Sequence, residues 1–255
     1  KWSVDMAYRA DRDLTFLSQC SDCDLDDLVN LLIYDSDGKK RWTEELSNNP
    51  LYKQFRPQHS LYWREIAAEI QCYGGNTFAT LLRGGKGVYY KEILIDVCKR
   101  LKVNFNSESE VGVIERNLLM KILSDALDKM SQQDIKELAL EFGLVNLKTF
   151  NREAMLAAIQ YIFNSGGFRS YQITVMLANV ILKALIGRGL TIAANATLVR
   201  IVSLLAGPIG WAITAAWTLV DIGGTAYRVT IPAVIQIAVL RSKINNNIKV
   251  DDIIF

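Results

Sequence analysis

The residues best suited to catalysis or metal binding are one histidine and two closely spaced cysteines. His59 is the only histidine, so a Ser–His–Asp or Cys–His site would have to use it. No nucleophile motif is visible near it. Cys20 and Cys23 have the spacing of a redox motif, but no βαβ pattern surrounds them and a metal site would need two more ligands. We expect structural roles, no metal or other cofactor and no enzymatic activity, with a redox or metal role for the cysteines as the alternative.

One acidic stretch superficially resembles a calcium-binding loop. Acidic residues and a glycine fall at positions three, five, six and twelve of such a loop, namely Asp35, Asp37, Gly38 and Glu44. The first position is Ile33, whose side chain has no oxygen that could coordinate a cation. The sequence therefore predicts a turn at Asp35–Gly38 rather than a calcium site.

A glycine-rich stretch, Arg83–Gly87, invites comparison with a phosphate-binding loop. It lacks the P-loop spacing and the following Ser or Thr, and no strand precedes it. We expect a backbone turn between helices. The alternative is anion binding, in which Lys86 would act together with the N-terminus of a helix beginning at Val88.

Composition narrows the class of protein. Half of the 255 residues are hydrophobic, which excludes a disordered chain, and the net charge of +2 gives no case for nucleic-acid binding. All but three of the 27 acidic residues precede residue 169. The four cysteines do not suggest a secreted disulfide framework. We expect a native start at Met6 without a signal peptide and a cytoplasmic location, which could be peripheral to the inner membrane.

Apolar residues recur at helical spacing along the whole chain, and no alternating strand pattern with hairpin turns is present. The sequence therefore predicts an all-α, multi-helix globular bundle. Capping signals are Ser21 with Asp24, Ser107 with Glu110, and Ser131 with Asp134. The expected helices are Asp11–Leu17, Asp24–Leu32, Ser60–Tyr73, Thr77–Leu82, Val88–Lys102, Ser107 to about Met130, Ser131 to Gly143, and Asn151–Asn164.

The C-terminal third is apolar and slightly basic. Residues 201–220 form twenty uncharged positions, which at about 1.5 Å per residue equal the thickness of a bilayer core. Gly207-Pro208 interrupts them, because proline breaks a helix but suits its first turn. We therefore expect two helices, one ending near Ala206 and one beginning at Pro208, packed closely through many Gly and Ala residues.

Three arrangements of this hairpin, residues 189–220, stay open. It could be a buried core, a permanent transmembrane hairpin, or an element that is buried in one state and meets lipid or a client protein in another. After it, the stretch from Ile231 to Leu240 is expected to be a helix with Pro232 in its first turn. Gln236 would be hydrogen-bonded inside the core, and Arg228 could pair with Asp221.

Several stretches together resemble the YaaW family of bacterial proteins. They are residues 13–21, 69–76, 82–84, 90–102 and, most specifically, Ala226–Arg241. The resemblance covers nearly the whole chain. The family has no settled activity, and parts of it have been likened to ubiquinol–cytochrome c chaperones, which assist the assembly of a membrane complex. The resemblance therefore implies a chaperone-like module at the level of the fold.

We thus expect four regions: 6–105 (acidic helices), 106–168 (middle helices), 169–243 (a central apolar hairpin and the C-terminal helix) and 244–255 (a tail). The first functional hypothesis is a membrane-interacting apolar region that binds, inserts into or forms a pore in a membrane, as a stress or defence effector. The alternative is a chaperone-like binding module for assembly of a membrane protein. The partner would be a membrane surface or a membrane-protein client, with the oligomeric state open.

Two sets of residues are expected to make these contacts. Membrane or partner contacts are expected from Pro208, Ile209, Trp211 and Trp217. Candidate polar contacts in a groove are Gln71, Asn76, Arg83, Tyr227, Arg228 and Gln236. An exposed face on the hairpin would favour a partner site or a membrane site.

Overall fold

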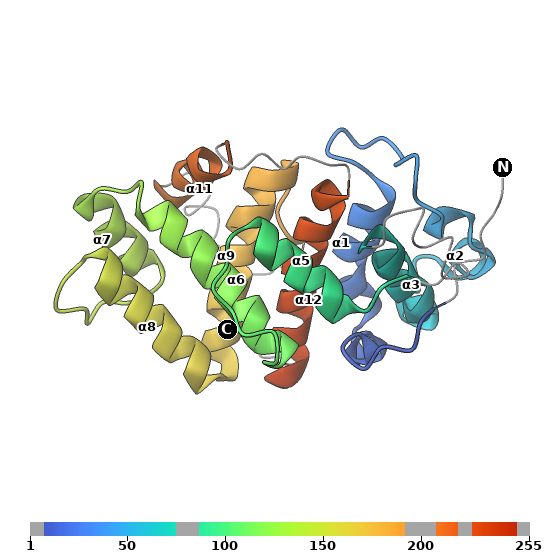
Figure 1. Cartoon of the computed structure of the whole chain (residues 1–255), viewed down its shortest axis with the longest axis horizontal. Helices are drawn as coiled ribbons and strands as arrows, with labels where there is room; N and C mark the ends of the chain where they lie inside the picture. Colours follow the sequence, from blue (N-terminus) through green and yellow to red (C-terminus); the bar gives the residue numbers. More distant parts are fainter. Residues whose placement is uncertain (1–7, 75–86, 192–207, 219–225, 249–255) are drawn as a thin grey trace.

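The computed structural model describes residues 8–74, 87–191, 208–218 and 226–248 (Figure 1). These residues form an all-α bundle, as predicted, and the described part of the chain contains no strand. The α-helices are α1 (Asp22–Ile33), α2 (Pro50–Phe55), α3 (Trp63–Gly74), α5 (Tyr90–Arg100), α6 (Val111–Leu127), α7 (Gln132–Glu141), α8 (Arg152–Ser165), α9 (Gly167–Ile186), α11 (Pro208–Thr218) and α12 (Tyr227–Asn245). The described residues also include the short 3-10 helices η1 (Thr15–Gln19), η2 (Leu46–Asn48) and η3 (His59–Tyr62).

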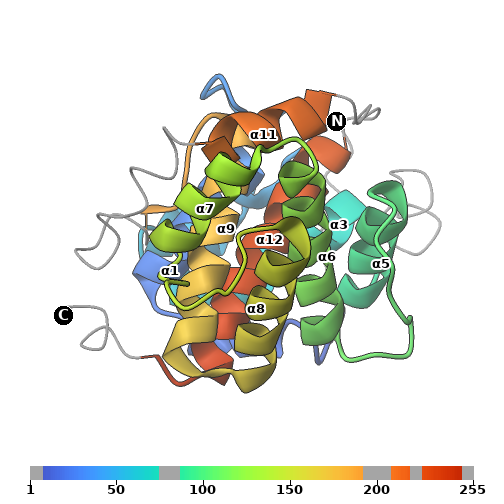
Figure 2. The ribbon, with the colours of Figure 1, turned by 90° about the vertical axis from the view of Figure 1, so that its left-hand side faces the viewer.

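Helix α12 runs through the centre of the bundle. It contacts α9, α1, α6, α5 and α3, which surround it in Figures 1 and 2. Every residue from Val229 to Arg241 is buried. A helix that is apolar around its whole circumference must be covered on all sides, and α12 is the element around which the others pack.

Helix α11 is the helix of the predicted hairpin that the structure describes. It lies at one end of the bundle, against α6, α7 and α9 (Figure 2). It begins at Pro208, as predicted from the interruption at Gly207-Pro208, and proline at this position leaves no intrahelical hydrogen bond unmade. The helix expected to end near Ala206 lies outside the described residues, as does the one expected at Thr77–Leu82.

Two of the three predicted capping boxes are confirmed. The Ser21 hydroxyl accepts a hydrogen bond from the backbone amide of Asp24, and the Asp24 carboxylate accepts one from the backbone amide of Ser21. Ser131 and Asp134 form the same arrangement. The third prediction, at Ser107, is wrong: α6 begins at Val111 with Glu110 as its N-cap residue. Asn106 instead organises a turn, because its side chain accepts from the Glu108 amide and its carbonyl from the Ser109 amide.

The position predicted for Pro232 is also wrong. Helix α12 begins at Tyr227, so Pro232 lies inside the helix and not in its first turn. Proline cannot donate a hydrogen bond to the carbonyl of Arg228, four residues earlier. Arg228 is itself exposed, as the second residue of α12.

The helix predicted at Asp11–Leu17 is instead the 3-10 helix η1, which begins at Thr15. The other predicted boundaries within the described residues agree with the structure to within a few residues. The turn at Asp35–Gly38 is present, closed by a hydrogen bond from the Gly38 amide to the Asp35 carbonyl. Gly143 ends α7 with a positive φ angle of 67°, as expected of a glycine at this position. Among the described helices, none combines the length and the hydropathy of a membrane span.

Candidate functional site

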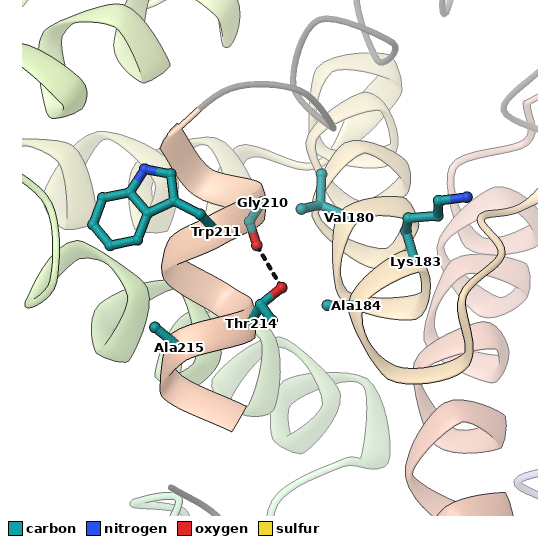
Figure 3. Close-up of a pocket in the computed structure, with 7 residues that line it drawn as sticks. All are labelled: Val180, Lys183, Ala184, Gly210, Trp211, Thr214 and Ala215. Carbon is teal, nitrogen blue, oxygen red and sulfur yellow. Dashed lines mark hydrogen bonds between the residues drawn. The ribbon is translucent and has the colours of Figure 1, made fainter. Parts of the chain in front are cut away.

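A groove lies between α9 and α11. It has a volume of about 490 Å³ and is lined by Val180, Lys183, Ala184, Gly210, Trp211, Thr214 and Ala215. Figure 3 shows Val180 and Ala184 directed from α9 toward α11, with Thr214 facing them. The lining is apolar or small apart from Lys183, and small residues allow another helix to approach closely.

Helix α11 divides into a buried face and a groove-lining face. Ile209, Ala212 and Ile213 are fully buried, at the i, i+3, i+4 spacing of a core stripe. The groove-lining residues include Trp211, whose exposed fraction is 49%. The Thr214 hydroxyl donates to the Gly210 carbonyl at 2.9 Å, so this polar group is satisfied inside the helix. The groove wall is therefore a surface of low polarity.

The C-terminal end of α9 is fixed to α1, which holds one wall of the groove in place. Gly187 ends α9 in the left-handed conformation, with φ of 73°. The Arg188 guanidinium then donates to the Asn30 carbonyl at 3.2 Å. The backbone amide and the hydroxyl of Thr191 both donate to Asp27, at 2.6 and 2.5 Å. These bonds tie the chain beyond α9 to the C-terminal half of α1.

The predicted contact residues of α11 divide between core and surface. Trp211 lines the groove and is half exposed. Ile209 is fully buried, so it supports the helix from below and does not form the surface. Pro208 and Trp217 belong to α11, but their side chains lie outside the described residues.

The predicted polar contacts do not gather at this groove. Gln71 is buried, where its side chain exchanges hydrogen bonds with the backbone of Arg9 at 3.0 and 2.9 Å. Tyr227 lies under the Arg100 guanidinium, and burial, with a contribution from Asp96, raises the pKa of its hydroxyl. Arg228 is exposed. Asn76 and Arg83 lie outside the described residues, as does Asp221, the partner expected for Arg228.

Gln236 is buried in the middle of α12, as predicted. Its Oε1 atom, however, has no hydrogen-bond partner among the described residues, so the expected hydrogen bond to this oxygen is not found there. An unmet buried acceptor destabilises a fold by about 1–3 kcal/mol. Gln236 is not among the described residues that line the groove.

The candidates for chemistry have structural contacts. His59 is buried, with its Nδ1 atom against the Tyr62 hydroxyl and its Nε2 atom 3.1 Å from Asp26, which ties η3 to α1. Burial raises the pKa of Tyr62, so this hydroxyl is a poor nucleophile. Cys20 is buried and Cys23 exposed, and neither forms a disulfide. Within the described ranges, no three His, Cys, Asp or Glu residues are placed to hold a metal ion.

The sequence interpretation missed two buried ion pairs that fix α12. Arg241 donates to both oxygens of Glu115 at 3.1 and 3.0 Å, and the Tyr90 hydroxyl donates to the same carboxylate at 2.5 Å. Lys243 contacts Asp24 at 2.6 Å. Burial raises the pKa of Glu115, while the Arg241 charge and the Tyr90 hydroxyl oppose that rise. The available signal was Glu115 lying between Val111 and Leu119 on the apolar face of α6.

Comparison with protein families gives the class of protein. Residues 58–235 match the family described as ubiquinol-cytochrome C chaperone, and residues 8–42 match a domain of unknown function, DUF3944. The first match covers well over half of the chain and includes both walls of the groove, α9 and α11. The chain therefore carries the chaperone-like domain expected from the resemblance.

Comparison with individual proteins identifies the family. A UPF0174 protein of Helicobacter pylori is 48% identical over 238 residues, which is 93% of this chain and 94% of the relative. The UPF0174 protein YaaW of Escherichia coli is 33% identical over 252 residues, or 95% of this chain and 98% of the relative. The chain belongs to the UPF0174 family, which includes YaaW, and the predicted resemblance is confirmed.

The comparisons bear unequally on the two functional hypotheses. The family match fits the chaperone-like hypothesis loosely, and nothing in it supports insertion, pore formation or a role in stress or defence. No solved structure matches the chain.

Proposed function

We propose that this protein is a chaperone-like binding module that holds an apolar helix of a membrane-protein client in the groove between α9 and α11. The observation that carries the proposal is the groove itself, a half-open, low-polarity surface between two helices. An amphipathic helix that lays its apolar face into such a groove is a recurrent mode of recognition. The name of the matched family, ubiquinol-cytochrome C chaperone, supports a client of this kind.

The lining residues favour a helix over an extended peptide. Val180 and Ala184 are one helical turn apart on α9, and Gly210 and Thr214 are one turn apart on α11. A strand would need a row of free backbone hydrogen-bonding groups, which neither helix offers along its length. Residues four apart form continuous ridges that receive the side chains of a third helix.

Fluorescence anisotropy with a labelled 20-residue helical peptide, carrying one Ala- and Leu-rich face, tests the proposal. We expect saturable binding to the full chain. Ala184→Leu fills the groove and should weaken binding at least tenfold. Ala157→Leu makes the same change at an exposed position of α8 and should leave binding unchanged. Equal binding by both variants and the unchanged protein would place the peptide elsewhere and refute the proposal.

A second candidate function is a peripheral contact with the surface of the inner membrane. The specific observation is that Trp211, a large aromatic residue, is half exposed beside the groove. This observation favours a membrane contact because tryptophan prefers the headgroup region of a bilayer. Sedimentation with vesicles of phosphatidylglycerol and phosphatidylethanolamine tests it. We expect Trp211→Ala to reduce the bound fraction, and protein that stays in the supernatant would refute this candidate.

A further inference from the structure

We infer that the client helix carries an acidic residue beside its apolar face, and that Lys183 at the rim of the groove pairs with it. This inference rests on the proposed function and specifies the partner more narrowly. Among the described residues that line the groove, Lys183 is the charged one and none is acidic. A negative charge on the client beside Lys183 would therefore complement the charge of the described lining.

Lys183 differs from Arg188 and Arg41, whose guanidinium groups already hydrogen-bond within the fold. The Arg188 guanidinium donates to the Asn30 carbonyl, and the Arg41 guanidinium donates to the Leu31 carbonyl at 3.0 Å. Both therefore satisfy carbonyls in the last turn of α1. Lys183 is exposed and has no acidic partner among the described residues.

The position of Lys183 restricts where the client's carboxylate can lie. Figure 3 shows its side chain leaving α9 on the side away from α11, so its ammonium group stands at the edge of the groove and not over the floor. Between α9 and α11 the groove is lined by Val180 and Ala184 with Thr214 facing them, and the Thr214 hydroxyl already donates to the Gly210 carbonyl. An ionised carboxylate placed there would lose its hydration without a cationic partner. The acidic residue must therefore flank the apolar stripe of the client helix.

Three versions of the labelled peptide test the inference, with Glu, Gln or Lys at the position that flanks the stripe. We expect the unchanged protein to bind the Glu peptide about fivefold more tightly than the Lys peptide, with the Gln peptide between them. Lys183→Glu should reverse this order. Lys99→Glu is the matched control, because Lys99 is an exposed lysine in the last turn of α5, as Lys183 is in the last turn of α9.

The outcomes separate this inference from the proposed function. Reversal by Lys183→Glu but not by Lys99→Glu supports the inference. Equal binding of all three peptides overturns the inference and leaves the helix-binding function standing. Failure of every peptide to bind overturns both. A preference that Lys99→Glu also reverses would show that net charge and not the groove selects the peptide, which likewise overturns the inference.

Discussion

Helix α11 and the C-terminal half of α12 come from the same apolar third of the chain, yet different forces hold them. Arg241 and Lys243 tie α12 to Glu115 and Asp24 through buried ion pairs. Helix α11 contains no charged residue and is held by the burial of Ile209, Ala212 and Ile213. Apolar contacts do not fix one geometry as tightly as charge-assisted hydrogen bonds do, and here the Arg241 Nε atom donates to both oxygens of Glu115. The comparison indicates that α12 is the fixed scaffold and α11 the adaptable wall of the groove.

The largest expected effect comes from breaking the ion pair of α12. Arg241→Met leaves Glu115 buried without its cation, so we expect a loss of about 3–5 kcal/mol in the free energy of unfolding. Urea denaturation measures this loss. The double variant Arg241→Met with Glu115→Leu removes both charges and should recover most of it. A single variant as stable as the unchanged protein would mean that the pair does not fix α12.

A buried carboxyl without a cation beside it sharpens the contrast with these pairs. Burial raises the pKa of Glu69 from 4.5 to about 8, although its carboxylate accepts from the Glu45 amide at 3.2 Å. The folded protein then binds this proton more tightly than the unfolded chain does. The free energy of unfolding should therefore fall as pH rises from 4.5 to about 8, by up to about 1.4 kcal/mol per pH unit.

Glu69→Gln tests this pH dependence, because glutamine keeps the shape of the protonated acid and does not titrate. We expect the variant to gain stability relative to the unchanged protein as pH rises from 5 to 8, by roughly 2–4 kcal/mol over the window. Urea denaturation at several pH values gives the difference. Parallel curves for the two proteins would show that Glu69 has an ordinary pKa in the fold.

The adaptability of α11 can be measured with a matched pair of substitutions. Ile235 in α12 and Ile213 in α11 are both fully buried. Ile235→Ala should lower the free energy of unfolding by about 2–5 kcal/mol, as is usual for a cavity in a packed core. Ile213→Ala should lower it by about 1–2 kcal/mol less, because α11 can separate locally before the whole protein unfolds. Equal losses would mean that α11 belongs to the same cooperative unit as α12.

Local signals in the sequence were enough to predict the fold class and many helix ends. Ser21, Ser131 and Pro208 each act within one helical turn, and each prediction is confirmed. The prediction at Ser107 failed because Asn106 forms a turn there by accepting from the Glu108 and Ser109 amides, and α6 begins only at Val111. The pairing of Glu115 with Arg241 joins residues 126 positions apart, so no local pattern could show it.

The candidate site was predicted only in part, for the same reason. The spacing of Ile209, Ala212 and Ile213 could have separated the buried face of α11 from Trp211, because it is the i, i+3, i+4 spacing of a core stripe. The opposing wall, Val180 and Ala184, is about thirty residues away in sequence, and only the packing of α9 against α11 brings it to the groove.

The most direct test of the account is amide hydrogen exchange of the full chain with and without the Glu-bearing helical peptide. Without peptide, α11 should exchange faster than α12, because α11 contains no charged residue and so lacks buried ion pairs like those that hold α12. With peptide, protection should rise in α9 near Val180–Ala184 and in α11 near Gly210–Ala215, while α12 stays unchanged. Protection that rises elsewhere, or nowhere, would contradict the claim that the α9–α11 groove is where this protein holds its client.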